Sequence, residues 1–336
     1  MATLNQSEKK SLTFGAIFGR WEVTLILLII IVSIVCTSLS PYFLDVTNLF
    51  NMTTNFMEKA VMALPMAFVI IIGAIDLSVA SNLALSSIIM GLLYQGLGLP
   101  IWVAMIVGLI VGTFGGFING ILIGKVKLPA LAATLGTYAL YRGLCYSFIG
   151  DQTVANFPDS FLNIGLGTIG STPIPVQLVI FLVFAVIYGL LLHRTTFGRF
   201  TYAIGQNEEG CRFSGVPVDR TKIIIFSLNG LMAAVAGIIL AARFTSVRVD
   251  AGLGYELDVI TAVVLGGVDI AGGSGTIFGV VLSLFLLGLI RYGMSLLNIS
   301  GQIQSIAVGC MLIIAILVPY VTRQIRQKTR KQQLVE

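Results

Sequence analysis

The chain has 336 residues, of which 57% are hydrophobic and only 10% are charged, with a formal net charge of +5. An ordinary soluble domain carries roughly 25% charged residues, so this composition excludes a globular fold with a water-facing surface. The surface must instead face lipid. One membrane-spanning helix needs about 20 mostly apolar residues, which leaves room for about ten.

The first apolar run, Trp21 to Leu39, is expected to be the first spanning helix. It is too long for the hydrophobic region of a cleavable signal and lacks a small-residue cleavage site. Apolar runs separated by polar or Gly- and Pro-containing segments predict ten spans, with boundaries uncertain by about 2–4 residues. These lie at 21–40, 57–74, 78–98, 101–124, 129–149, 176–193, 221–243, 257–271, 275–297 and 302–322. We therefore predict a single all-α transmembrane domain over residues 1–336, whose run at 257–271 is short enough for an incomplete crossing.

Basic residues decide the predicted orientation. An even number of spans places both termini on one side, and cytoplasmic termini put 15 of the 20 Lys and Arg residues inside, as the positive-inside rule requires. The cytoplasmic parts are then the segment 1–20, the loop 194–220 and the tail 323–336, in which the run 323–331 suits an anionic-lipid surface. The five basic residues that this orientation does not place on the cytoplasmic side are Lys59, Arg142, Arg243, Arg248 and Arg291.

A weak internal repeat relates two Gly-rich stretches. Residues 73–81 (GAIDLSVAS) match 266–274 (GGVDIAGGS) at an offset of 193, and both copies would run in the same direction across the membrane. Paired, Gly-interrupted apolar segments in corresponding halves indicate a transport pathway. Chance similarity between two Gly-rich stretches is the alternative.

The loop 194–220 contains the longest charged stretch. Asn207 suits a helix N-cap, and Glu208 and Glu209 stand in the first turn, where the helix dipole favours acid. Arg212 follows Glu208 at i+4, and Ser214 with Gly215 ends the helix before Pro217. This predicts one short charged helix along the membrane surface. It is either a positively charged loop that follows the topology rule or a docking element for a cytoplasmic partner.

Polar side chains inside spans are costly and therefore candidates for a substrate pathway. Asn119 lies in the fourth span, and Tyr138, Tyr141 and Arg142 lie in the fifth, where aromatic faces and polar donors suit a hydroxylated ligand. Hydrogen bonding between helices is the alternative for Asn119, and positioning at the membrane interface is the alternative for Arg142. Asp76 suits capping of the following helix better than a place in the pathway.

Two segments are expected on the extracytoplasmic side, 150–175 and 243–258. The second has charges of alternating sign that would suit docking of a binding protein, although a solvated loop explains them equally. The charged residues concerned are Arg243, Arg248, Asp250, Glu256 and Asp258.

The residues that build common enzymatic and metal sites are missing from the sequence. One histidine, His193, and four scattered cysteines do not make a typical metal site. No G-x-x-x-x-G-K-[ST] phosphate loop occurs, so the energy for transport would come from a partner or an ion gradient. We expect no enzymatic activity, no metal, no cofactor and no nucleic-acid partner.

Three motifs together carry a resemblance to a known family. They are GRFTYAIGQNEEGCRFSG at 198–215, GAIDLSVAS at 73–81 and TAVVLGGVDIAGGSGTIFG at 261–279. In their order along the chain, 73–81, 198–215 and 261–279, they resemble ribose-type carbohydrate ABC importer permeases, the ribose, rhamnose and autoinducer-2 group of the branched-chain amino acid and sugar permease superfamily. The likeness covers residues 20–322. The sequence departs from the family at Ala80, which is typically Gly, and at Gly210-Cys211, where two alanines are usual.

The resemblance implies a permease subunit of about ten helices in a bacterial inner membrane. It would pair with a second permease, identical or similar, and with two ATP-binding subunits and an extracytoplasmic substrate-binding protein. The 207–215 helix would then couple ATP hydrolysis to import of a pentose, a deoxyhexose or autoinducer-2. The alternatives are an ion-coupled secondary transporter, for which Asp76 is the one appealing membrane carboxylate, and a branched-chain amino acid permease.

Overall fold

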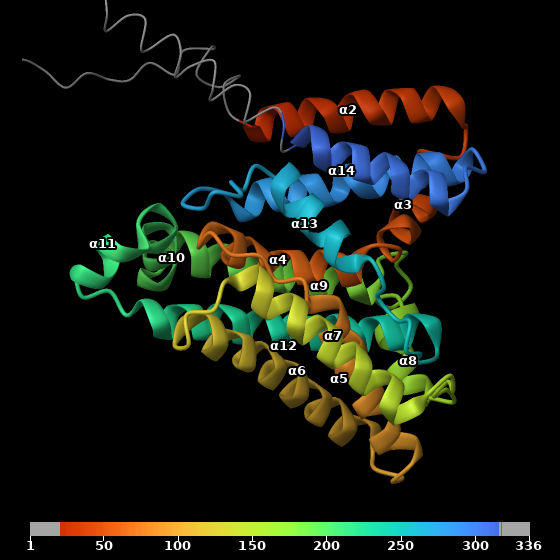
Figure 1. Cartoon of the computed structure of the whole chain (residues 1–336). Helices are drawn as coiled ribbons and strands as arrows, with labels where there is room; N and C mark the ends of the chain where they lie inside the picture. The colour runs from red at the N-terminus through yellow and green to blue at the C-terminus, as the bar shows by residue number, and fades with distance from the viewer. Residues whose placement is uncertain (1–20, 316, 318–336) are drawn as a thin grey trace, which may run out of the picture.

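The computed structural model describes residues 21–315 and 317, and in this part every element longer than an isolated β-bridge is a helix. The predicted cytoplasmic segment 1–20 and the tail 323–336 lie outside the described residues. In chain order (Figure 1) the helices are α2 (Trp21–Leu39), α3 (Val46–Thr53), α4 (Met57–Ile71), α5 (Val79–Gln95), α6 (Ile101–Gly124), α7 (Ala130–Ile149), α8 (Asp159–Leu166), α9 (Val176–Arg194), α10 (Thr196–Gln206), α11 (Glu208–Phe213), α12 (Val218–Phe244), α13 (Tyr255–Leu265), α14 (Ile277–Leu296) and Gly301–Ala315. The all-α prediction is confirmed for these residues.

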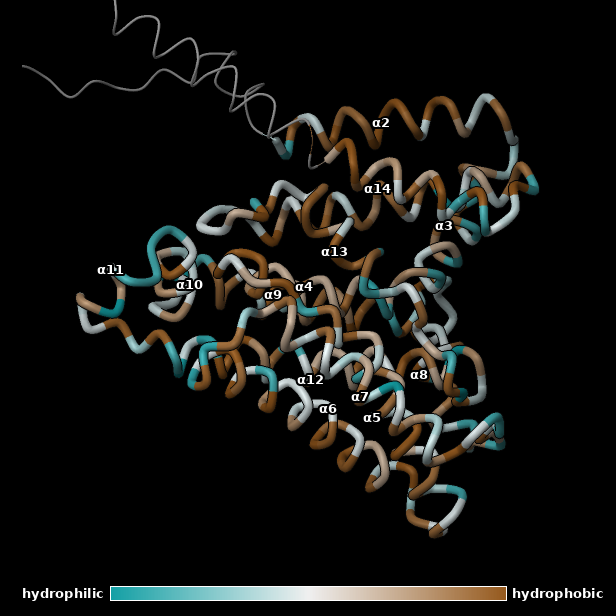
Figure 2. The backbone as a smooth tube through the Cα atoms, viewed as in Figure 1, coloured by the Kyte–Doolittle hydropathy of each residue, from teal (hydrophilic) through white to brown (hydrophobic). Residues whose placement is uncertain are grey.

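Within the described residues, five helices are long and apolar enough to cross a membrane: α2, α6, α9, α12 and α14. Helices α3 and α4, which meet at 54°, make a sixth if they count as one bent span. Figure 2 shows apolar residues along α2 and α6 and polar ones gathered at α10 and α11. The other predicted spans correspond to the helices α5, α7, α13 and Gly301–Ala315, and part of the predicted span 302–322 lies outside the described residues. Within the described residues, the structure thus supports five or six of the ten.

Helix α12 forms the centre of the bundle and packs against α4, α5 and α6. Its approach to α6 is close because glycines face each other. A Cβ at Gly116 would collide with the carbonyl oxygen of Phe226, and one at Gly230 would collide with that of Gly112. Small residues let helix backbones touch in this way and gain dispersion contacts where lipid offers no hydrophobic drive.

Two Gly-rich loops interrupt the bundle and meet each other. Helix α4 ends before Gly73 (φ +75°), and α13, which at 11 residues is only about 16 Å long, ends before Gly267 (φ +87°). The backbone N–H of Gly273 donates to the carbonyl oxygen of Ile71 (2.7 Å), which joins the end of α4, where loop 72–78 begins, to loop 266–276. These are the two stretches that the sequence relates by an internal repeat.

The two loops also share a local turn. In the first, Asp76 Oδ1 accepts the N–H of Ser78 (2.9 Å), and in the second, Asp269 Oδ1 accepts the N–H of Ala271 (3.0 Å). A carboxylate that accepts an N–H two residues onward is an Asx-turn, which replaces a backbone hydrogen bond where the helix has stopped. The two aspartates of the repeat therefore have the same local geometry.

Candidate functional site

Helix α11 forms from interactions within its own few residues. Asn207 Oδ1 accepts the N–H of Gly210 (2.8 Å), so Asn207 is the N-cap that the sequence predicts. Arg212 Nη2 donates to Glu208 Oε1 (3.0 Å) across one turn, and Gly215 (φ +79°) follows the C-cap. Ser214 Oγ donates to the carbonyl oxygen of Gly210 (2.8 Å) and closes the last turn. Six residues alone do not make a stable helix, so α11 depends on its neighbours.

Those neighbours are charged side chains at the start of α12. Lys222 Nζ donates to Glu208 Oε2 (2.6 Å), and Arg212 Nη2 pairs with Asp219 Oδ1 (2.5 Å). Burial would raise the pKa of Glu208, but hydrogen bonds from Lys222 and Arg212 outweigh it and hold this pKa below its ordinary value. The ionised carboxylate therefore ties α11 to α12 at neutral pH, and this contribution is lost only as the pH falls through the lowered pKa.

The opposite face of α11 is unpaired within the described chain. Glu209 is exposed, and Phe213, one turn later, has 91% of its surface exposed. Residues at i and i+4 lie side by side on a helix, so an acid and an aromatic ring project together from the end of the molecule that holds α10 and α11 (Figure 1). Of the predicted residues, Glu208 and Arg212 thus face inward and Glu209 outward.

Helix α10 connects this surface to the two Gly-rich loops. Tyr202 Oη donates to the carbonyl oxygen of Gly275 (2.6 Å), and Gln206 Nε2 donates to that of Gly273 (3.0 Å). A Cβ at Gly205 would collide with the carbonyl oxygen of Ile71 and the backbone nitrogen of Gly273. The C-terminal turn of α10 therefore lies directly against both interrupted segments, and α11 begins two residues further along the chain.

A buried polar cluster joins α5, α6 and α12. Asp76 Oδ1 accepts the hydroxyl of Ser78 (2.6 Å), Asp76 Oδ2 accepts Nδ2 of Asn229 (2.8 Å), and Asn119 Nδ2 donates to Ser78 Oγ (2.7 Å). The structure thus brings two predicted pathway residues, Asp76 and Asn119, together. Both carboxylate oxygens of Asp76 accept hydrogen bonds, and the residue is only 2% exposed, so these bonds link the start of α5 to α12.

The other two predicted pathway residues lie on α7, apart from that hydrogen-bond network. Tyr141 is buried, and its hydroxyl donates to the carbonyl oxygen of Gly115 on α6 (2.8 Å). Tyr138, one turn earlier, is half-buried. The geometry gives Tyr141 a helix-pairing contact and leaves Tyr138 as the more accessible ring of the two.

The five basic residues that break the positive-inside pattern all pair with groups at the opposite end of the molecule from α11. Arg243 Nη2 binds the fully buried Glu58 (2.8 Å), and Arg142 Nη1 donates to the carbonyl oxygens of Val249 and Ala251. The remaining pairs are Lys59–Asp258 (2.6 Å), Arg291–Asp258 (2.7 Å) and Arg248–Asp250 (3.0 Å). Each exception thus has a specific partner close to segment 243–258.

This placement divides the predicted docking residues. Arg243 faces inward to Glu58, and Glu256 is half-buried in the first turn of α13. Only Arg248 and Asp250, 62% and 49% exposed, face outward, and they pair with each other. Of the charged residues predicted to dock a binding protein, the structure thus exposes one ion pair, Arg248–Asp250, on the loop between α12 and α13.

Comparison with known proteins now identifies the family. A family model described as the permease component of a branched-chain amino acid transport system matches residues 48–316. The chain belongs to this permease family. No solved structure matches the permease at a significant level.

Several curated relatives match the permease over most of its length. The L-arabinose transport system permease protein of Escherichia coli K12 is 38% identical over 309 residues, which are 92% of this chain and 93% of the relative. The ribose import permease protein of Bacillus subtilis 168 is 38% identical over 317 residues, 93% and 96% of the two chains. The autoinducer 2 import system permease protein of Escherichia coli O9:H4 is 34% identical over 303 residues, 88% and 91%. The predicted resemblance is confirmed.

Sequence reasoning gave no functional or structural role to three side chains of the permease. Phe213 is an apolar residue in an otherwise polar helix, and Asn229 is an amide in the apolar run 221–243. Lys59 is a charge at the start of a predicted span. Each residue differs in polarity from its neighbours in the chain, and that difference is the signal by which the sequence marks it.

Proposed function

We propose that this chain is the membrane-spanning subunit of an ATP-driven importer for a sugar or sugar-like solute, of the pentose, deoxyhexose or autoinducer-2 kind. The proposal is supported by relatives over about nine tenths of the chain whose names specify arabinose, ribose and autoinducer-2 import. It rests above all on α11, whose exposed Phe213 and Glu209 form the surface that a cytoplasmic ATPase would bind. The permease itself carries out no catalysis, and ATP hydrolysis belongs to the partner.

We infer a topology of ten crossings in a bacterial inner membrane, with both termini cytoplasmic. The chain directions are consistent with it. Helices α10 and α11, from the Arg-rich loop, lie at the opposite end from the five paired basic residues of the outer side. Helix α13 alone would span only half of a hydrocarbon core of about 30 Å, and loop 266–276, which reaches α10, would complete the crossing before α14 begins.

The proposed assembly contains a second permease, identical or similar, two ATP-binding subunits and an extracytoplasmic substrate-binding protein. One ATP-binding subunit would dock on α11 of each permease. The binding protein would dock over the outer loop that carries Arg248 and Asp250, the exposed members of the predicted docking set. Residues 323–331 would contact anionic lipid.

We infer that alternating access is driven through α10. Closure of the ATPase dimer would displace α11, and α10 would pass the displacement to loops 72–78 and 266–276 through Tyr202, Gly205 and Gln206. A chain interrupted by glycines bends at low cost because it lacks continuous helical hydrogen bonds. The corresponding loops of the two repeats would therefore move together. Ion coupling would need an available membrane carboxylate, whereas Asp76 is fully engaged in hydrogen bonds.

Reconstitution tests the proposal. The tagged permease should co-purify with an ATP-binding subunit and, in proteoliposomes, should import ribose or arabinose only with ATP at the cytoplasmic face and a loaded binding protein outside. Uptake by this chain alone, powered by a proton or sodium gradient, would contradict the proposal.

Replacing Tyr202 with phenylalanine should lower the amount of solute imported per ATP several-fold while leaving ATPase binding intact. The change removes the hydroxyl that donates to Gly275 and leaves that carbonyl without its partner, a loss of about 1–3 kcal/mol at the contact. The effect is measured as the ratio of solute imported to ATP hydrolysed in proteoliposomes. Tyr146→Phe, an exposed ring on α7, is the matched control and should behave as wild type. An unchanged ratio in Tyr202→Phe would remove α10 from the coupling route.

A further inference from the structure

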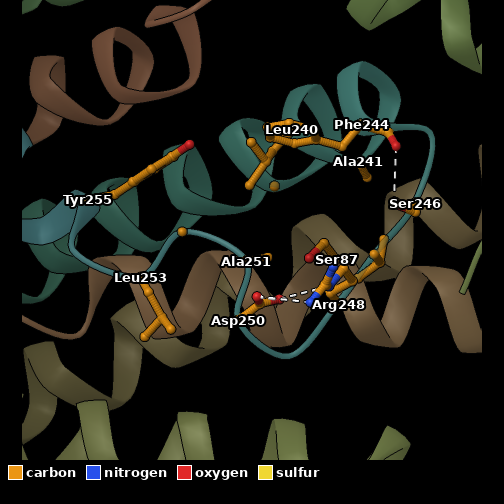
Figure 3. A pocket seen from close by; sticks show the side chains of 13 residues that line it. Ser87, Leu240, Ala241, Phe244, Ser246, Arg248, Asp250, Ala251, Leu253 and Tyr255 are labelled. Carbon is orange, nitrogen blue, oxygen red and sulfur yellow. Dashed lines mark hydrogen bonds and ion pairs between the residues drawn. The ribbon is translucent and has the colours of Figure 1, made fainter. Parts of the chain in front are cut away.

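A cavity lies at the outer end of the permease, where the loop between α12 and α13 folds over α5 and α12. Its volume is about 360 Å³, and it is bordered by Ser87 of α5, Leu240 and Phe244 of α12, and the loop residues 246–248 and 250–253. Pockets for small molecules measure about 300–1,000 Å³, so the space suits one small solute. Figure 3 shows Ser87 beside Arg248 and Asp250, with Leu240, Ala241 and Phe244 along α12 on the other side of the view.

The chemistry of the walls suits a neutral, hydroxyl-rich molecule. Arg248 Nε and Nη2 pair with the two carboxylate oxygens of Asp250 (3.0 and 3.2 Å), which places the two groups side by side at the cavity wall. The remaining guanidinium hydrogens and carboxylate lone pairs can donate to and accept from adjacent hydroxyls of one ligand. Because the pair is neutral overall, it does not select a charged solute. Phe244 and Leu253 supply apolar surface for the carbon-bearing faces of a sugar ring.

The loop is held in place before any solute arrives. Val247 and Val154 exchange backbone hydrogen bonds (2.8 and 3.0 Å), which anchors the start of the loop to the segment after α7. Arg142 of α7 donates to the carbonyl oxygens of Val249 and Ala251, and the N–H of Leu253 donates to the carbonyl oxygen of Asp250 (3.2 Å). Preorganisation of this kind lowers the entropy lost on binding. These hydrogen bonds fix the loop in one conformation, as expected for a preformed binding site.

We propose that this cavity is the entry site of the permease, where a neutral polyhydroxylated solute binds as it leaves the binding protein, with Arg248 and Asp250 contacting its hydroxyls. The inference rests on the proposed function and adds a solute site to it. Tyr255, which lines the cavity, also donates its hydroxyl to Glu58 (3.2 Å), so the site adjoins the buried ion pairs that hold α13 to α4 and α12.

The test uses the complete importer in proteoliposomes, with ribose and arabinose as the probes and the binding protein loaded and saturating. Asp250→Asn removes carboxylate acceptance, and Leu253→Trp fills the cavity from its exposed edge. Each should lower transport about tenfold, which for Asp250→Asn is the equivalent of one or two lost hydrogen bonds. In Leu253→Trp, which leaves the Arg248–Asp250 pair in place, stimulation of ATPase by the loaded binding protein should stay within about twofold of wild type. Asp151→Asn and Leu257→Trp, exposed positions outside the cavity lining, are the matched controls and should transport normally.

A charge-swapped double variant, Arg248→Asp/Asp250→Arg, separates a solute contact from a structural ion pair. It keeps the pair but reverses its donors and acceptors, so transport should remain low. Normal transport in the swap or in the single variants would overturn the inference. Loss of ATPase stimulation in step with transport in Leu253→Trp would also overturn it, because the loop would then dock the binding protein only. A wild-type complex without ATP-dependent import would instead refute the proposed function, before any variant is compared.

Discussion

Replacing Phe213 with alanine should weaken capture of the ATP-binding subunit by roughly 30-fold to 1,000-fold. The ring is 91% exposed on α11, and in the assembly it would enter a pocket of the partner. Truncation of a buried aromatic anchor costs about 2–4 kcal/mol at a protein interface, which corresponds to this range at 1.4 kcal/mol per tenfold change. Titration of the cognate ATPase onto detergent-solubilised, immobilised permease measures the change in Kd.

The control for this experiment is Phe148→Ala, which removes an exposed ring at the outer end of α7 and should leave the Kd unchanged. Glu208→Gln is a second, informative comparison. Glu208 holds α11 to Lys222 and Arg212 rather than facing a partner, so its loss should loosen the helix and weaken binding indirectly. A Phe213→Ala permease that binds the ATPase as tightly as wild type would contradict the docking assignment.

The parts of the permease that could be predicted from the sequence are those set by nearby residues. Asn207 caps Gly210 and Glu208 reaches Arg212 within four positions, so the spacing alone predicted α11 correctly. Apolar runs predicted the long helices for a similar reason, because a helix in lipid satisfies its backbone internally and only its length and composition have to fit.

Distant pairings could not be predicted in this way. Asn229 meets Asp76 across 153 positions, and Lys59 meets Asp258 across 199. Only the packing of α4, α5, α12 and α13 brings these groups together. Arg243 and Arg248 also looked equivalent in the sequence, since both are arginines five residues apart in a charged segment. The fold turns one toward a buried acid and leaves the other exposed.

That difference between the two arginines leads to the second large expected effect, a strong loss of stability in Arg243→Ala. Glu58 is fully buried, and Arg243 is the cation that pairs with it directly (2.8 Å). Arg243 also donates to the carbonyl oxygen of Thr54 (3.0 Å). Removing one partner of a buried ion pair leaves an uncompensated charge and costs about 3–5 kcal/mol. The purified permease in detergent should therefore unfold at a Tm lower by an amount on the order of 10 °C.

Arg248→Ala is the matched comparison for stability, since its pair with Asp250 is largely exposed and worth about 0–1 kcal/mol. A double variant, Glu58→Gln/Arg243→Gln, removes both charges together and should recover much of the stability lost in Arg243→Ala, because no lone buried charge remains. Equal Tm values for Arg243→Ala and Arg248→Ala would contradict the assignment of Glu58–Arg243 as a buried pair. If the double variant were no more stable than Arg243→Ala, the unpaired charge of Glu58 could not be the cause of the loss.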